Sequence, residues 1–265
     1  MGLRLKQVPA LQGALWVRRG LRAFLQSPLG FSTQLMAFFF ATMLLSLLLP
    51  FVGSLLSLMA LPLLSLAAMA GTASTLKGGM PHPGQLIEPL RTPGPRRATL
   101  LKLCGLYGAL SLLVLVLAQQ VMGDALQQLQ TVYTQDATPE QVQAATGDPR
   151  LVQGLGLQLL LMSLLSVPFW HAPALVHWAG QGLGQALFSS TVAVWRCRGA
   201  FVVYAAMWLG LLITAGTAAT LIAALFGATR LLGVAVLPLA LMGMTAFYAS
   251  LYFTFDDSFG LDEPA

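Results

Sequence analysis

Six long apolar segments constrain this chain more than any other feature of its sequence. Each is close to the roughly 20 residues that a helix needs to cross the hydrocarbon core of a bilayer. They are residues 31–49, 54–76, 100–122, 151–176, 200–226 and 231–255. Only 9% of the residues are charged, whereas soluble domains carry about a quarter. The sequence therefore predicts an all-α, polytopic membrane helical bundle with six transmembrane helices, in a single membrane domain.

The distribution of basic residues predicts the orientation of these spans. The chain has 14 Lys and Arg residues, and all but Arg150 and Arg230 lie in segments that six spans place on one side of the membrane. These segments are the amino terminus and the connections after the second and fourth spans. Because cytoplasmic loops carry the excess of Lys and Arg, both termini are expected in the cytoplasm, in a bacterial inner membrane.

Residues 8–26 are expected to form an amphipathic helix lying in the membrane interface. Ala14, Val17, Leu21 and Phe24 recur at helical spacing and share one face. Arg18, Arg19 and Arg22 fall on the opposite face and are candidate ligands for lipid headgroups. Trp16 suits the headgroup level. The alternative is an ordinary basic segment beside the membrane with no further role.

Residues 180–198 predict a second interfacial helix on the cytoplasmic side. Gln185, Ser189 and Arg196 form a narrow polar stripe, and Leu183, Leu187 and Val194 face the other way. Arg196 and Arg198 are further candidates for contact with lipid headgroups.

The six spans pair into hairpins at 31–76, 100–176 and 200–255, joined by loops of two kinds. The cytoplasmic loop 77–99 contains five prolines and four glycines, which exclude a long helix. The periplasmic loop 123–150 is acidic instead. Its sequence Thr138-Pro139-Glu140-Gln141 has the pattern of a capping box with Pro at the first helical position. We therefore expect a small helical cap on the far side of the bundle.

The stretch from Val167 to Trp178 is the best candidate for a functional site. Pro168 and Pro173 each remove one helical hydrogen bond, which leaves free carbonyls near the membrane surface. A binding pocket at this depth would combine His171, His177, Tyr204, Tyr248, Tyr252 and Asp256. We expect His171 and Asp256 to lie close together. The alternative is an aromatic belt with interfacial histidines, which is common at membrane boundaries.

Small residues recur every four positions in the fifth span. Ala215, Ala219, Ala223 and Gly227 form a smooth ridge that allows close helix approach. Packing within the chain is one interpretation, and a dimer interface or contact with another membrane protein is the other.

The sequence carries none of the familiar motifs of hydrolases, redox enzymes or phosphate-binding loops, so no catalytic residue, metal or cofactor is expected. The basic clusters between apolar segments do not form a nucleic-acid-binding face. Ion-coupled transporters usually keep ionisable groups within their spans, and these spans have none at depth. We expect a non-catalytic structural or accessory protein that binds lipid or a membrane-protein partner. Alternatives are a transporter or flippase-like protein for an amphipathic substrate and, third, an intramembrane enzyme using His171 and Asp256.

Several short motifs carry a family resemblance. They are Ala172-Pro173-Ala174-Leu175-Val176, Ala186-Leu187-Phe188-Ser189-Ser190, Ala193, Arg196, Phe201 and Tyr204, with Trp16, Gly20, Phe24, Pro28 and Pro62-Leu63-Leu64 nearer the amino end. In these motifs the chain resembles uncharacterised polytopic inner-membrane proteins of proteobacteria. The resemblance implies a bacterial inner-membrane protein of five or six helices, and it departs in the polar loop 123–150. It implies no particular activity.

Overall fold

A computed structural model of the chain describes residues 5–91, 93–134, 138–225 and 229–260. Every regular element among them is helical. The long helices are α2 (Pro28–Leu48), α3 (Pro50–Leu76), α5 (Pro95–Met122), α8 (Pro149–Phe169), α11 (Arg198–Leu225) and α12 (Thr229–Phe259). With α8 continued through α9, these give six candidate membrane spans within the described residues, judged by length and apolar composition. The predicted all-α fold with six spans is confirmed at this level.

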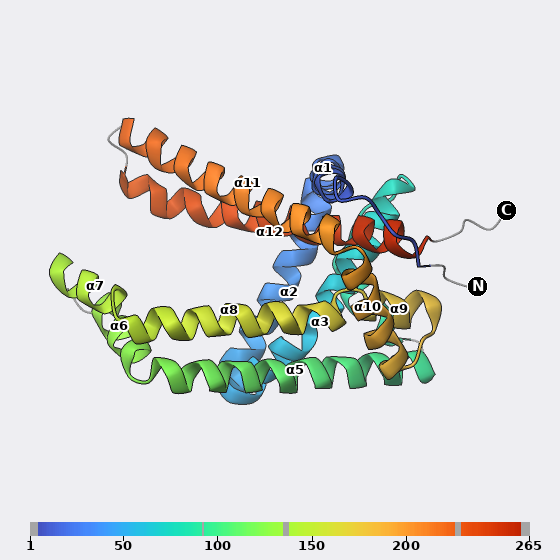
Figure 1. The fold of residues 1–265 in the computed structure, drawn as a ribbon, viewed down its shortest axis with the longest axis horizontal. Helices are drawn as coiled ribbons and strands as arrows, with labels where there is room; N and C mark the ends of the chain where they lie inside the picture. Colours follow the sequence, from blue (N-terminus) through green and yellow to red (C-terminus); the bar gives the residue numbers. More distant parts are fainter. Residues whose placement is uncertain (1–4, 92, 135–137, 226–228, 261–265) are drawn as a thin grey trace.

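Shorter helices lie between the spans and before the first of them. They are α1 (Gln12–Gln26), the 3-10 helix η1 (Pro83–Leu86), α4 (Glu88–Arg91), α6 (Ala125–Thr134), α7 (Pro139–Thr146), α9 (Ala172–Ala179) and α10 (Leu183–Arg196). Figure 1 shows α1, α9 and α10 toward the end of the molecule that carries both termini, with α6 and α7 at the opposite end. Helices α5 and α8 run side by side, and the α2–α3 hairpin crosses the other spans in this view.

The fourth span, which is expected as one segment over residues 151–176, consists of two helices in the structure. Helix α8 ends at Phe169 and α9 begins at Ala172, with the break placed between Pro168 and Pro173. The hydroxyl of Ser190, on α10, forms hydrogen bonds with two backbone groups at this break. It donates to the carbonyl of Val167 (3.0 Å) and accepts from the backbone N–H of His171 (3.0 Å). Two backbone groups released by the break are thus satisfied inside the protein, as a low-dielectric environment requires.

The turn between the first two spans is tighter than expected. Instead of a turn over residues 50–53, Leu49 alone separates α2 from α3, and Pro50 already occupies the first turn of α3. Proline suits that position because its missing N–H would have no partner within the helix.

Helix α1 packs against the bundle through a closely fitting face. A Cβ at Gly13 would collide with the backbone of α11 at Ala200, and a Cβ at Gly20 would collide with Ser250 of α12. Trp16 lies between these glycines and is fully buried. Its indole N–H donates to the carboxylate of Asp257 (2.7 Å) near the end of α12. Trp16 therefore contacts protein and not the lipid headgroups, contrary to expectation.

The far end carries the expected short helices. The Thr138 hydroxyl accepts from the Gln141 N–H (3.4 Å), and the Gln141 side chain accepts from the Thr138 N–H (2.9 Å), which is the capping box predicted for α7. Asp148 caps α8 by accepting from the Arg150 N–H (2.8 Å). The hydrogen bond from the Arg150 side chain, with this backbone bond, lowers the pKa of the Asp148 carboxyl.

Candidate functional site

His171 occupies the centre of an aromatic cluster. It is fully buried, and its ring packs against Phe201, Phe255 and Phe259 with centroid distances of 5.9, 5.9 and 5.4 Å. Edge-on and tilted contacts at these distances stabilise aromatic packing. The imidazole is therefore part of the core, between α11 and the end of α12.

The polar contacts of His171 identify its tautomer. Its Nε2 lies 3.2 Å from the hydroxyl oxygen of Thr254, which also accepts from the indole N–H of Trp170 (3.1 Å). The Thr254 hydroxyl donates its own proton to the carbonyl of Leu251 (2.7 Å). Because a hydroxyl has one proton to give, the Thr254 oxygen accepts from His171, and Nε2 is the donor. Nδ1 has no hydrogen-bond partner among the described residues.

The expected pairing of His171 with Asp256 is not formed. Neither ring nitrogen of His171 bonds the acid: Nε2 contacts Thr254, and Nδ1 has no hydrogen-bond partner among the described residues. Thr254 and Asp256 are two residues apart on a helix, so their side chains point to different faces. Helix rotation brings Thr254, and not Asp256, to the histidine.

The other residues proposed for the pocket fall into separate environments. Tyr204 is buried, and its hydroxyl bonds that of Ser250 (2.6 Å). Tyr252 packs edge-on against Trp178 (6.2 Å between centroids). Tyr248 lines a cavity of about 240 Å³, and His177 lines another at the terminal end. His171 and Tyr204 share the aromatic cluster around Trp170 and Phe201, but the six residues do not surround one cavity.

The three arginines of α1 have different roles in the structure. Arg19 forms an ion pair with Asp257 (3.2 Å), which also accepts from the side chains of Gln12 and Trp16. Arg18 and Arg22 are exposed. They share their face with exposed leucines: Leu11 is 78%, Leu15 41% and Leu25 68% exposed.

Helix α10 presents a comparable outer face. Its buried stripe consists of the small residues Ala186, Ser190 and Ala193. On its outer side Phe188 is 71% and Trp195 is 69% exposed. Arg196 and Arg198 are exposed as well, and the Arg198 guanidinium lies 5.5 Å from the centre of the Trp195 ring.

The small-residue ridge of α11 is only partly covered. Ala215 is exposed, Ala219 is half-buried and Ala223 is buried, while Gly227 lies outside the described residues. Packing within the chain covers one end of the ridge. The dimer interface, or a contact with another membrane protein, stays a prediction.

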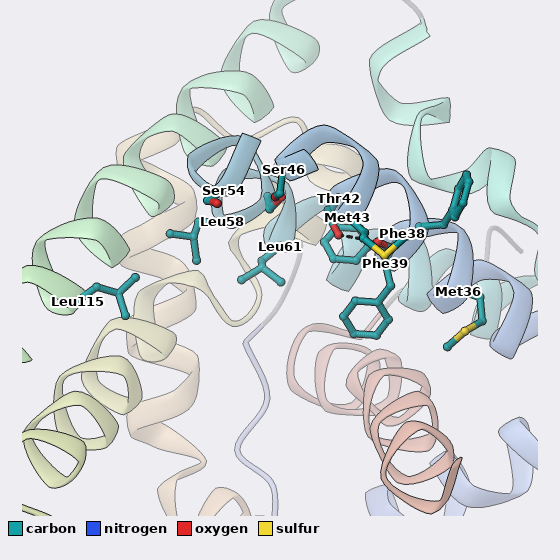
Figure 2. A pocket seen from close by; sticks show the side chains of 12 residues that line it. Met36, Phe38, Phe39, Thr42, Met43, Ser46, Ser54, Leu58, Leu61 and Leu115 are labelled. Carbon is teal, nitrogen blue, oxygen red and sulfur yellow. Dashed lines mark hydrogen bonds between the residues drawn. The ribbon is translucent and has the colours of Figure 1, made fainter. Parts of the chain in front are cut away.

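A large apolar hollow lies where the sequence does not predict a site. It is an open, groove-like cavity of about 900 Å³ between α2 and α3, reaching Leu115 of α5. Figure 2 shows Met36 to Ser46 of α2 on one side, and Ser54, Leu58 and Leu61 of α3 with Leu115 on the other. The full lining is Met36, Phe38, Phe39, Phe40, Thr42, Met43, Ser46, Ser54, Ser57, Leu58, Leu61 and Leu115. Its lining lies toward the α2–α3 turn at Leu49.

The cavity lining is mostly apolar, and three of its hydroxyl groups donate to backbone carbonyls of their own helices. The hydroxyl of Thr42 donates to the carbonyl of Phe39 (3.1 Å), that of Ser54 to Pro50 (2.7 Å) and that of Ser57 to Gly53 (2.7 Å). These three hydroxyl protons are therefore not available to a ligand, and none of the lining residues is charged. A wall of this kind suits a hydrocarbon chain.

Fold and surface together define a multi-pass membrane protein. Six apolar helices could each cross a bilayer, and large apolar side chains such as Leu212 (59%) and Leu225 (83%) stand exposed on α11. In water, exposure on this scale would cause aggregation, whereas lipid solvates it.

Comparison with known proteins agrees with this class. The chain is 29% identical over 270 residues to a probable inner membrane protein of Burkholderia thailandensis, covering 99% of this chain and 96% of that one. The resemblance to bacterial inner-membrane proteins is thereby confirmed. No family model and no solved structure matches the chain.

Proposed function

We propose that this protein is a non-catalytic, lipid-binding accessory protein of the inner membrane, and that the cavity between α2, α3 and α5 holds a lipid acyl chain. The single observation that carries the proposal is the apolar, uncharged lining of this 900 Å³ cavity (Figure 2). Apolar cavities exclude water. An opening toward the hydrocarbon region is instead filled by the acyl chains of the surrounding lipids. Met36 (41% exposed) and Phe40 (63% exposed) lie at such an opening.

Filling the cavity tests this proposal. Ser57→Phe would place a ring in the space between α2 and α3, whereas Ser163→Phe makes the same change on an exposed part of α8. Native mass spectrometry of protein extracted in mild detergent should show fewer retained lipids for Ser57→Phe than for wild type or Ser163→Phe. Equal lipid retention by all three proteins would refute lipid binding in the cavity.

The outer faces of α1 and α10 support a second contact with lipid. Leucines on α1 and the aromatic residues Phe188 and Trp195 on α10 would enter the upper acyl region, and the arginines beside them would reach the headgroup phosphates. This combination is typical of helices that lie in the interface. Arg18, Arg22, Arg196 and Arg198 are the candidates, and Arg19 is engaged by Asp257.

We place both termini in the cytoplasm, on the basis of the Lys and Arg distribution. A reporter that works only in the cytoplasm should be active after Ala265, and one that works only outside should be active near Ala137. The opposite result at both positions would reverse the orientation.

A flippase-like transporter is the second candidate, and one observation favours it. Leu61 lines both the 900 Å³ cavity and the 240 Å³ cavity, whose wall includes Tyr107, Ser166 and Tyr248. An apolar space thus adjoins a more polar one through a single side chain. If this is a route, reconstituted protein should accelerate transfer of a fluorescent phospholipid between leaflets, and Leu61→Trp should abolish the acceleration. Leu160→Trp, on the exposed surface of α8, is the matched control, and no acceleration by wild-type protein would exclude this function.

A further inference from the structure

A polar cavity lies at the terminal end of the bundle, apart from the aromatic cluster and the acyl-chain cavity. It has a volume of about 320 Å³. Its lining comes from the segment before α5, the first turn of α5 and the end of α9. The residues are Glu88, Pro89, Pro93, Gly94, Pro95, Arg96, Arg97 and His177.

The backbone around this cavity is conformationally restricted. Three prolines line it, each with a fixed φ, and Gly94 adopts φ 155°, a conformation that L side chains rarely adopt. Arg96 is positioned by the end of α9: its Nε lies 3.3 Å from the point that a Cβ on Gly180 would occupy. Gly180 itself has φ 64°, so this position favours glycine for two reasons. The segment that lines the cavity therefore has few backbone conformations available to it, while Glu88, Arg96 and Arg97 are exposed to solvent.

The charges of the cavity are not neutralised by the protein. Arg96 and Arg97 stand in the first turn of α5, which contains no acidic residue. The amino-terminal end of a long helix carries partial positive charge and favours anions, so two arginines there add to an existing positive potential. Neither arginine belongs to an ion pair formed among the described residues. Glu88 lines the same cavity, so two arginines against one glutamate leave one net positive charge beside His177.

We propose that this cavity binds a phosphodiester group, with Arg96 and Arg97 holding its oxygens beside the half-buried His177. Guanidinium groups match the oxygens of phosphate in geometry as well as charge. A single net positive charge matches a phosphodiester, which carries one negative charge, better than a doubly charged phosphate monoester.

The headgroup of a membrane phospholipid is the occupant favoured by position. The cavity opens where α5 begins, and the lipid-facing surface of α5 starts one turn later at Leu101, which is 47% exposed. The acyl chains could then follow α5. This inference involves different residues from the acyl-chain cavity, so it stands or falls independently of the proposed function.

The test is a titration of the full chain in mild detergent with dioleoyl phosphatidylglycerol, followed by native mass spectrometry. The variants are the double substitution Arg96→Gln/Arg97→Gln and the control Arg91→Gln, which removes an exposed arginine from α4 outside the cavity. The double variant should bind the first lipid at least about tenfold more weakly, since hydrogen bonds to charged groups contribute on that scale. Arg91→Gln should bind as wild type does. Equal weakening by both would mean unspecific attraction and would overturn the site, as would no weakening in either.

Two further arms keep the proposal testable if the double variant folds poorly. Glu88→Gln removes the negative charge from the cavity and should strengthen phosphatidylglycerol binding, so unchanged or weaker binding would contradict the proposal. Inorganic phosphate at millimolar concentration distinguishes the source of the ligand. Failure to displace the lipid supports a phospholipid headgroup, whereas displacement in wild type but not in the double variant would keep the phosphate site and assign it to a soluble ligand.

Discussion

The two short helices α1 and α10 lie near the terminal end of the molecule and differ in what they bury: a large aromatic residue in α1 and only small residues in α10. Helix α1 buries a tryptophan, and Trp16 donates to Asp257 inside the protein. Helix α10 buries alanines and Ser190 and leaves Trp195 69% exposed. Both sequences predict amphipathic helices, yet the tryptophan points inward in one and outward in the other.

This difference shows that, beside a membrane, amphipathic periodicity alone does not determine which face of a helix packs against the protein. In water, the apolar face of a helix turns toward the protein because the solvent rejects it. Beside lipid, an apolar face is tolerated on either side, and close packing of small residues decides which face approaches the bundle. Gly13 and Gly20 perform this role in α1, and Ala186, Ser190 and Ala193 perform it in α10.

The largest expected effect comes from exchanging the two tryptophans for alanine. Trp16→Ala should lower the free energy of unfolding by about 3–5 kcal/mol, as for other buried large-to-small changes. Trp195→Ala should change it by less than about 0.5 kcal/mol, as for surface positions. Unfolding of both variants in the same detergent measures the difference. Similar losses would mean that α1 and α10 are not distinguished by burial.

Ser190 and Ser189 sharpen the comparison within α10. Ser190→Ala would leave the Val167 carbonyl and the His171 N–H unpaired at the break between α8 and α9. A buried unsatisfied group costs about 1–3 kcal/mol, so we expect a loss of about 2–3 kcal/mol in unfolding free energy. Ser189→Ala, at the neighbouring half-buried position, should be close to neutral. A stable Ser190→Ala protein would show that the break does not depend on this hydroxyl.

Asp257 is the corresponding polar contact of α1. Asp257→Asn should destabilise the protein by about 1–2 kcal/mol, because an amide cannot accept from Gln12, Trp16 and Arg19 as a carboxylate does. Glu140, an exposed acid of α7 that forms no ion pair among the described residues, serves as the control, and Glu140→Gln should leave the melting temperature unchanged. If both substitutions act equally, Asp257 does not hold α1 in place.

The smallest effect separates the arginines of α1. Arg18→Gln should weaken interaction with anionic lipid by about 1 kcal/mol and leave stability in neutral lipid unchanged. Arg19→Gln should instead lower stability in both lipids, since it removes the partner of Asp257. Melting temperatures in nanodiscs of anionic and neutral lipid provide the measurement. Identical behaviour of the two variants would contradict the assignment of separate roles.

The sequence predicts what depends on position along the chain. The six apolar spans and the capping box at Thr138 follow from hydropathy, Pro placement and local hydrogen bonding, and the structure has both, with the fourth span divided between Phe169 and Ala172. It does not predict what depends on helix rotation. His171 meets Thr254 and not Asp256, and the cavity beside Phe39 arises from how α2 and α3 diverge. In apolar spans no strong polar pattern indicates which side faces a neighbour, so these contacts need the structure.

The most direct test of the account is photo-crosslinking with a phospholipid that carries a diazirine in its acyl chain, followed by peptide mapping. Met43, in the acyl-chain cavity, should be labelled more strongly than Leu212, an exposed residue of α11. Ser57→Phe should reduce the labelling of Met43 and leave that of Leu212 unchanged. Equal labelling at the two residues, insensitive to Ser57→Phe, would show that the cavity holds no lipid in preference to the bulk membrane.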